Sequence, residues 1–340
     1  MEEFNNILSR SKIYAHPERL TQWMKTGKTL PITAEIDPTN KCNYNCKYCA
    51  GNKIPSQAEL TYNQMKTIID KISPFIKGIL FTGGGEPLIN PETTKAISYA
   101  HKKNIDVGLV TNGSLLHTVN QKQLLSDCEW IRIGIDAANQ ETYAKRKNIP
   151  KENYQKVWNN ISELVKTRNK HNLECTIGVA YLTENEEKRE LEAFTRLARD
   201  YKVDYVQFRP YHHVNNNLIK VIKELKQLKT DKFKVLYSRE KYKREKFDYK
   251  QAFGDEFRFV ISATGDVYPD CFTRGLAGFS YGNLLKQSFE GIWSSEKRKR
   301  ILESKLQQEN CPPQCKHDEL NQLLWLINRS KEEAEHKNFV

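Results

Sequence analysis

The sequence predicts an α/β fold organised around a parallel sheet. Up to about residue 212, six strand-like segments alternate with helix-like segments, a spacing typical of parallel strands joined by right-handed helical crossovers. The notable glycine-rich and polar motifs each stand where a predicted strand ends, at the sheet edge that carries the chemistry in such folds. The length of 340 residues suits one large α/β domain with a small appendage.

Each element follows from its hydrophobic pattern. A helical lead-in is expected over residues 1–30, where Leu20 and Trp23 have helical spacing. The predicted strands, several of them running into a turn, are 31–37, 78–87, 106–113, 130–136, 174–182 and 204–211. The helices predicted between them are 58–72, 93–104, 121–128, 152–170 and 185–202.

The pattern changes after Lys250. Residues 257–271 are typical of a β-hairpin turned at Thr264-Gly265-Asp266, and helices are expected at 297–309 and 319–330. The predicted organisation is a lead-in (1–30), a core (31–212), a basic connecting segment (213–250) and a small C-terminal α+β extension (251–340).

The net charge of +12 raises the question of a polyanionic partner. The excess is spread widely, is densest in 223–247, and lacks the aromatic–basic pattern of an RNA-binding module. A lysine-rich surface is the simpler interpretation, so we expect no nucleic-acid partner. An anionic small molecule, such as a nucleotide-linked sugar, would also suit a basic surface.

The expected cellular location follows from the absence of two kinds of apolar segment in the sequence. No run of about 18 apolar residues predicts a membrane helix, and the N-terminus has no apolar segment of a secretory signal. We therefore expect a cytoplasmic protein without a membrane partner. Cysteines stay reduced in that compartment, so clustered ones indicate metal ligands or catalytic thiols rather than disulfides.

Three of the eight cysteines fall within eight residues, as Cys42, Cys46 and Cys49 in a C-x3-C-x2-C pattern. The loop follows the first predicted strand. Zinc suits three cysteines in one tight loop without a nearby histidine less well than an iron–sulfur cluster does. Three thiolates on a four-iron cluster leave one iron open for another ligand.

This loop resembles the cluster loop of the radical S-adenosylmethionine (SAM) superfamily. Tyr48 stands directly before the third cysteine, where the family usually has an aromatic residue. The resemblance implies a partial (β/α)6 TIM-like barrel with a [4Fe-4S] cluster whose open iron binds SAM. It also implies reductive cleavage of SAM to a 5′-deoxyadenosyl radical and an external one-electron reductant such as flavodoxin or ferredoxin.

Further motifs carry the same resemblance. Gly83-Gly84-Gly85-Glu86 matches the family's GGEP motif, and Thr111-Asn112 begins a TNG turn. Both are expected to contact SAM. Gly134 stands where relatives commonly have a serine, which puts one hydrogen bond to SAM in doubt. Asp136 ends the same segment. The cofactor-binding residues expected from the resemblance are Gly83, Gly84, Gly85, Glu86, Thr111, Asn112, Gly134, Asp136 and Arg146. A surface position in a helix is the alternative for Arg146.

A second trio, Cys271, Cys311 and Cys315, lies in the C-terminal extension. Its frame, GDVYPDC, YGNLL, IW and CPPQC, resembles the SPASM/Twitch extensions that carry auxiliary iron–sulfur clusters. The chain has fewer cysteines than a full SPASM domain, so at most one auxiliary cluster is expected. His317 is a candidate fourth ligand, with Asp255, water or substrate as alternatives. Zinc held by the trio and His317 stays open.

The substrate side is expected where the sixth strand ends, in FRPYHH. Arg209, Tyr211 and His212 are the candidate substrate-side residues, since arginine suits phosphate or carboxylate and histidine suits proton transfer. A structural or SAM contact is the alternative for Arg209. Cys128 and Cys175 are interpreted as buried small hydrophobic residues.

Three functions were weighed. Only about 30 residues precede the first strand, too few for the peptide-recognition domain common in peptide-modifying relatives. A small polar substrate is therefore expected, such as a sugar, aminocyclitol or nucleotide derivative, with oxidation, epimerisation or rearrangement as the outcome. Radical modification of a peptide is the second hypothesis. The third is a non-enzymatic iron–sulfur or zinc protein that binds nucleic acid, against which the GGGEP and TNG motifs argue.

Overall fold

The computed structural model describes residues 10–49, 51, 54, 56–211, 218–238, 240–242, 249–276, 278–304 and 317–333. Its centre is a ten-stranded sheet in the order β10-β9-β8-β1-β2-β3-β4-β5-β6-β7. The strands are β1 (Thr33–Ile36), β2 (Gly78–Phe81), β3 (Asp106–Thr111), β4 (Trp130–Gly134), β5 (Thr176–Thr183), β6 (Tyr205–Pro210), β7 (Lys234–Tyr237), β8 (Arg258–Ile261), β9 (Asp266–Tyr268) and β10 (Gly282–Asn283). The sheet is not closed, because β10 and β7 stand at its two ends.

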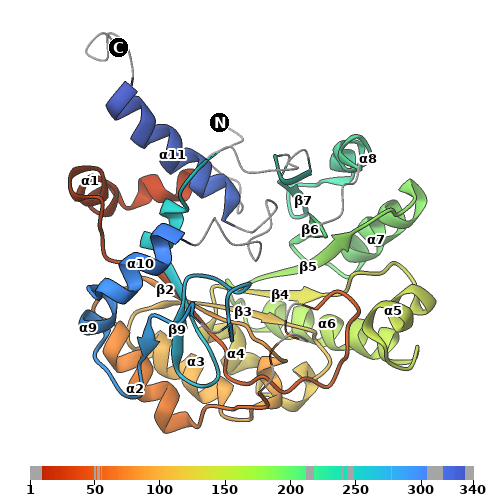
Figure 1. Cartoon of the computed structure of the whole chain (residues 1–340). Helices are drawn as coiled ribbons and strands as arrows, with labels where there is room; N and C mark the ends of the chain where they lie inside the picture. Colours follow the sequence, from red (N-terminus) through yellow and green to blue (C-terminus); the bar gives the residue numbers. More distant parts are fainter. Residues whose placement is uncertain are drawn as a thin grey trace.

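The strands β1 to β7 are all parallel to their neighbours, which confirms the predicted α/β architecture. The helices are α1 (Pro17–Thr26), α2 (Tyr62–Ile72), α3 (Thr93–Lys102), α4 (Gln121–Asp127), α5 (Gln140–Lys147), α6 (Asn153–Lys170), α7 (Lys188–Asp200), α8 (Ile219–Leu225), α9 (Phe289–Trp293), α10 (Glu296–Ser304) and α11 (Asp318–Glu333). Figure 1 shows α2, α3, α4 and α6 below the strands and α11 above them.

The two faces of the sheet differ in burial. Along β4, Ile131 and Ile133 are fully buried, whereas Trp130, Arg132 and Gly134 between them are partly accessible. Alternate residues of a strand point to opposite faces, so one face packs on the helices and the other faces the interior of the curved sheet. Arg132 therefore belongs to the interior face, where a polar ligand has access.

The basic connecting segment contributes more structure than expected. Residues 213–250 contain α8 and β7, and β7 extends the parallel sheet beside β6. The predicted hairpin is confirmed, since β8 and β9 pair antiparallel through a turn in which Gly265 has a φ of 81°. The structure adds that β8 lies parallel to β1, so the hairpin joins the same sheet.

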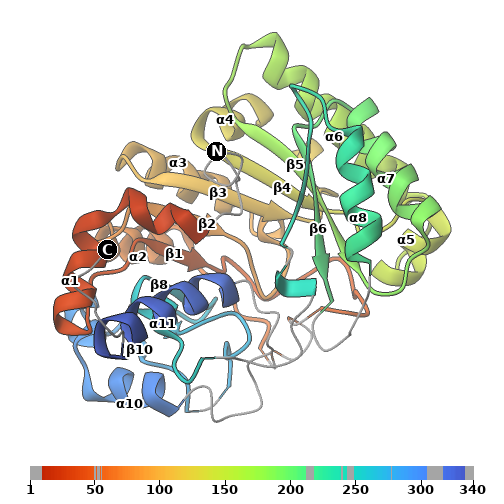
Figure 2. The same cartoon turned by 90° about the horizontal axis from the view of Figure 1, so that it is seen from above.

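Buried polar contacts attach the C-terminal residues to the first strand. Arg258 donates to Glu35 Oε1 at 3.2 Å, and Arg274 donates to Asp37 Oδ2 at 2.5 Å. Trp293 Nε1 donates to the Thr29 carbonyl at 2.8 Å. Figure 2 shows α1 and α11 on the side of the molecule that carries β1 and β8, away from α5 and α7.

None of the described helices combines the length and the apolar character needed to cross a lipid bilayer.

Candidate active site

The cysteine loop begins directly after β1, at the carboxyl edge of the parallel sheet. Cys42 and Cys49 are exposed and Cys46 is half-buried, so all three thiols are reachable. The amide of Tyr44 donates to Cys42 Sγ at 3.4 Å, a contact of the kind that stabilises a ligating thiolate. The sequence and the fold together bring these three thiols to one loop at the sheet edge.

The glycine turn after β2 packs directly on the start of this loop. The Gly85 amide donates to the Thr39 carbonyl at 3.1 Å, and the Glu86 amide donates to the Lys41 carbonyl at 2.9 Å. A Cβ on Gly85 would lie 1.9 Å from the Lys41 carbonyl oxygen, and one on Gly84 would lie 2.5 Å from Asn40 Oδ1. Only glycine permits so close an approach of the two backbones.

The turn after β3 holds the loop from a second side. Asn112 Nδ2 donates to Asn43 Oδ1 at 2.9 Å, and Asn43 Nδ2 donates to Ser114 Oγ at 2.8 Å. Thr111 is buried and donates to Glu86 Oε1 at 2.6 Å. The TNG turn therefore touches both the cysteine loop and the glycine turn.

The Glu86 carboxylate is the buried link between these two turns. Besides the Thr111 hydroxyl, it accepts from the Asn112 amide at 2.7 Å and the Leu88 amide at 3.1 Å. Burial raises the pKa of Glu86, and these donors partly offset that effect. Both carboxylate oxygens thus accept hydrogen bonds from the protein, and Glu86 connects the turn after β2 to the turn after β3.

The end of α5 holds the loop from a third side. The amides of Asn45 and Lys47 donate to the carbonyls of Lys147 (3.3 Å) and Arg146 (3.0 Å). The Arg146 guanidinium donates to the carbonyls of Asp136 and Leu182, each at 2.9 Å, and pairs with the Glu186 carboxylate. The structure therefore places Arg146 in a buried framework behind the loop.

Lys147 is a residue of this site that the sequence analysis missed. Its side chain is 8% exposed, and its ammonium donates to Asp136 Oδ2 at 2.6 Å. Asp136 Oδ1 accepts from the Leu182 amide at 2.6 Å, and Asp136 has a φ of 60°. Three basic residues in a row, Lys145 to Lys147, look alike in the sequence, and only the buried carboxylate singles out the third.

The charges of Asp136 and Lys147 affect each other's pKa and that of Cys46. Burial alone would raise the pKa of Asp136, but Lys147, together with Arg209 and the Leu182 amide, lowers it below its usual value. Burial alone would lower the pKa of Lys147, but Asp136 and Cys46 raise it. Burial raises the pKa of Cys46 to about 11, while Lys147 favours its thiolate. Lys147 thus supplies positive charge next to a cysteine of the loop.

Lys147→Met is expected to lower the free energy of unfolding by about 2 kcal/mol at pH 7, because it leaves the Asp136 carboxylate, whose side chain is only 19% exposed, without its charged partner. The lowered pKa of Asp136 means that this stabilisation is present above its unfolded pKa of about 4 and is lost as the pH falls through the folded value. The raised pKa of Lys147 means that it is also lost as the pH rises above about 10.4, through the folded value.

Urea unfolding at several pH values checks this prediction. The difference between wild type and Lys147→Met should be constant between about pH 5 and pH 9 and shrink in acid. Lys145→Met, an exposed position in the same helix, is the matched control. An equal loss of stability in the control would contradict the assignment of the effect to the buried pair.

The three thiols suit an iron–sulfur cluster better than one metal ion. Among the residues that the structure describes, no three Cys, His, Asp or Glu side chains converge closely enough to hold a single ion. Cys42, Cys46 and Cys49 nevertheless stand within eight residues of one loop, and the Cys49 amide donates to the Cys46 carbonyl at 3.2 Å. Spaced thiols fit a cluster, because each thiolate binds a different iron atom.

Aromatic residues continue the site toward the end of β6. Tyr48 donates to Glu184 Oε2 at 2.5 Å, and its ring lies 4.4 Å from the ring of Tyr211, measured between centroids. Tyr211 donates its amide to the Thr183 carbonyl at 2.8 Å. The predicted substrate-side Tyr211 therefore contacts the cysteine loop. His212 lies outside the described residues.

A cavity of about 430 Å³ opens on the interior face of the sheet. Its wall combines side chains of β1, β4, β6 and β8 with residues of η1 (Arg10–Ala15), η6 (Glu240–Tyr242) and α11. Arg209 lines it, as the substrate-side prediction requires, and so do Arg132 and Gln207. The sequence analysis missed Arg132, although a charged residue within the apolar strand WIRIG was a usable signal.

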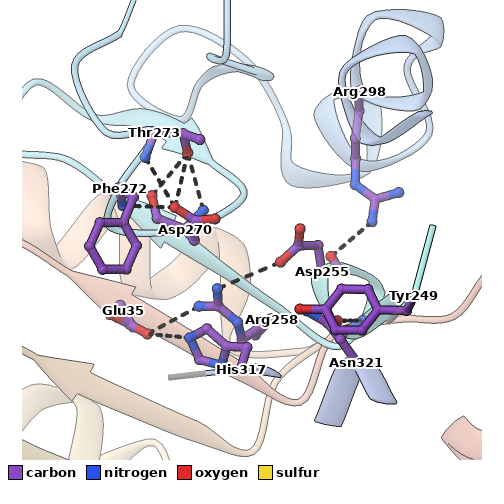
Figure 3. Close-up of polar contacts among 11 residues, drawn as sticks. Glu35, Tyr249, Asp255, Arg258, Asp270, Phe272, Thr273, Arg298, His317 and Asn321 are labelled. Carbon is purple, nitrogen blue, oxygen red and sulfur yellow. Dashed lines mark hydrogen bonds and ion pairs between the residues drawn. The ribbon is translucent and has the colours of Figure 1, made fainter. Parts of the chain in front are cut away.

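The C-terminal cysteine site is only partly described. Cys271 follows β9, while Cys311 and Cys315 lie outside the described residues. Figure 3 shows His317 and Arg258 side by side, both approaching Glu35, and the His317 Nε2 to Glu35 Oε1 distance is 3.9 Å. Gly134 has only Asp136 Oδ2, at 4.0 Å, near the position of a Cβ, so space lies above it.

Comparison with known proteins adds two family matches. The model of the radical SAM superfamily matches residues 36–195, and the model of the SPASM iron–sulfur cluster-binding domain matches residues 253–317. The first contains the cysteine loop, the glycine turn and the TNG turn. The second contains Cys271, Cys311 and Cys315. These families imply a [4Fe-4S] cluster, bound SAM and an auxiliary cluster.

Individual relatives are more distant. The chain is 34% identical over 116 residues to an AdoMet-dependent heme synthase of Methanosarcina barkeri, which covers 33% of each chain. It is 29% identical over 188 residues to a GTP 3′,8-cyclase of Aliarcobacter butzleri, covering 53% of this chain and 56% of the relative. The chain thus spans between a third and just over half of these two relatives.

Among solved structures, SuiB of Streptococcus suis bound to S-adenosylmethionine has a similar fold. The TM-score is 0.65 at 11% identity, over 87% of this chain and 72% of SuiB. At this identity the likeness supports the fold, a partial barrel with a C-terminal extension.

Proposed function

Because this chain is a radical SAM superfamily enzyme with a C-terminal SPASM domain, we propose that it uses the radical from SAM to take a hydrogen atom from a small polar substrate. The observation that carries the proposal is the attachment of the cysteine loop. Three neighbouring segments hold it at one sheet edge, and the ring of its Tyr48 contacts the ring of Tyr211 just after β6. Oxidation, epimerisation and rearrangement of the substrate are the candidate outcomes.

We propose that Cys42, Cys46 and Cys49 hold the cluster that binds SAM. When bound, this cluster supplies the electron for the cleavage of SAM to a 5′-deoxyadenosyl radical, and an external one-electron reductant replenishes it. The glycine turn, Gly83 to Gly85, offers backbone groups next to the loop, and the space at Gly134 supports a place for SAM. Glu86, Thr111, Asn112, Asp136 and Arg146 make up the polar frame of the proposed SAM site.

The protein's own part in the proposed reaction is to orient the substrate and to exclude water from the cavity. The proposed substrate cavity lies inside the curved sheet and is covered by residues of η1 and α11. Its volume of about 430 Å³ suits a small molecule. Arg209 of β6 lines this cavity, and Tyr211, which directly follows β6, contacts the cysteine loop, so we propose that they orient the substrate toward the loop.

We further propose that Cys271, Cys311 and Cys315 hold the auxiliary cluster, with His317 a candidate for the remaining position. The position of His317 against Glu35, on the cavity wall, supports a contact between this cluster region and the substrate cavity. Metal analysis separates the alternatives: about eight irons per chain support two four-iron clusters, and about four irons with one zinc support the mixed site.

The test of the proposed function is SAM cleavage by the reconstituted protein. The full chain is loaded with iron and sulfide under anaerobic conditions and then supplied with dithionite and SAM. We expect 5′-deoxyadenosine to form even without substrate. A protein with a filled cluster that forms none would contradict the proposal, and activity that requires a peptide would favour the peptide hypothesis over a small substrate.

A further inference from the structure

Two arginines face the interior cavity without a carboxylate partner. Arg132 Nη1 donates to Gln207 Oε1 at 2.8 Å, and its guanidinium lies 5.5 Å from the ring centroid of Trp130. Arg209 Nε is buried and has no hydrogen-bond partner among the described residues. Within the same described part of the chain, neither arginine forms an ion pair, although both line the cavity.

The other arginines with little exposed side chain are neutralised. Five arginines whose side chains are at most 13% exposed each pair with a carboxylate: Arg146 with Glu186, Arg168 with Asp204, Arg258 with Glu35, Arg274 with Asp37 and Arg298 with Glu256. This is the usual arrangement, because a buried charge without a partner is costly. Among the described residues, Arg132 and Arg209 lack such a carboxylate partner, and both line the cavity.

The two guanidinium charges also act on one another. Burial first, and then the charge of Arg209, lower the pKa of Arg132 to about 10. Glu35 and Asp136 offset this effect on the pKa of Arg132 only in part. Glu35 accepts from Arg258, and Glu319 accepts from the Ser238 hydroxyl. Lys12 and Lys241 add further positive charge to the wall.

We propose that Arg132 and Arg209 form an anion-binding site in the barrel cavity, and that the substrate of the enzyme is anchored there by a carboxylate or phosphate group. This inference rests on the proposed function, because it names the substrate class of the same cavity. The guanidinium group binds either anion through two parallel hydrogen bonds, and two such groups match a doubly charged one. Trp130 and Phe208 supply apolar wall for the rest of the substrate.

The position of the anchor sets the direction of the substrate. Arg209 is the residue before the last of β6 and acts electrostatically on Asp136. Asp136 pairs with Lys147, whose carbonyl holds the cysteine loop. An anion held between Arg209 and Arg132 therefore leaves the remainder of the substrate free to extend toward the loop.

Calorimetric titration of the reconstituted holoenzyme tests the site, with inorganic phosphate and succinate as probes at constant ionic strength. We expect at least one probe to bind, with a Kd that rises about tenfold or more in Arg132→Gln and in Arg209→Gln. The matched control is Arg189→Gln, whose side chain is 86% exposed on α7. Preference for one probe identifies the anionic group. No binding to wild type, or an equal loss in the control, overturns the proposal.

Thermal unfolding without added anion gives a second readout. Removing one of two facing positive charges is expected to raise Tm, by about 1–3 °C in each variant. A purely structural role predicts a fall instead, and a fall in both variants overturns the proposal. Formation of 5′-deoxyadenosine separates the two hypotheses. Cleavage of SAM without anion binding rejects only this site, whereas anion binding without SAM cleavage rejects the proposed function.

Discussion

Replacing Cys42, Cys46 and Cys49 together with alanine is expected to reduce 5′-deoxyadenosine formation to background, a loss of at least about 1000-fold. These side chains are the only proposed protein ligands of the SAM-binding cluster, and without thiolates it has no attachment. The iron content should fall by about four atoms per chain, while the auxiliary site keeps its metal. Anaerobic reconstitution followed by iron analysis and product quantification measures both effects.

The matched control for this variant replaces the two cysteines of the hydrophobic core, Cys128 and Cys175, with alanine. Both are buried, 4% and 3% exposed, and pack in the hydrophobic core. The double variant should unfold more easily and yet keep the full iron content and SAM cleavage. Survival of SAM cleavage in the triple variant, or its loss in the folded double variant, would move the catalytic cluster away from the loop.

Gly85→Ala is expected to lower the free energy of unfolding by about 3 kcal/mol and to reduce cluster loading. The added Cβ would lie 1.9 Å from the carbonyl oxygen and 2.5 Å from the carbonyl carbon of Lys41. Both are backbone atoms, so the glycine turn and the loop must separate, which is a mechanism of large destabilisation. Because Lys41 directly precedes Cys42, this separation displaces the first thiol.

Gly78→Ala is the matched control, at the start of β2, the strand that leads into the glycine turn. A Cβ there would meet the Asp106 carbonyl oxygen only at 3.6 Å, an ordinary contact. We expect this variant to unfold within about 1 kcal/mol of wild type and to load iron normally. Denaturant unfolding and iron content after reconstitution compare the two variants. Normal iron content in Gly85→Ala would show that the turn is not needed to shape the loop.

Elements with a strong local pattern were predicted well from the sequence. The strands and helices between residues 31 and 211 have alternating or helical apolar spacing, and the structure contains each of them. Helix α5 was expected only in the alternative given for Arg146, and helix α8 and strand β7 were not predicted. Helix α5 is polar apart from Tyr143 and Ala144, and β7 is a four-residue strand within a lysine-rich segment, so neither has a strong hydrophobic period.

Some parts of the candidate site were likewise predictable from the sequence, and others were not. The GGGEP and TNG motifs were found from their positions after strands, and the structure brings both against the cysteine loop. Lys147 and Arg132 were not found. Each becomes distinctive only through a partner or neighbour far away in the chain, Asp136 for the first and Arg209 for the second.

The sequence by itself determined the family and the three cysteines expected to hold the cluster, because eight consecutive residues contain the whole ligand pattern. Tertiary structure alone decided which charges are neutralised and which face the cavity unpaired. The pairing of β8 with β1 brings Arg258 to Glu35, while the order β4-β5-β6 brings Arg132 toward Arg209. The free energy of a buried charge depends on the groups that surround it in space. The order of the strands in the sheet, rather than spacing along the sequence, determines which groups those are.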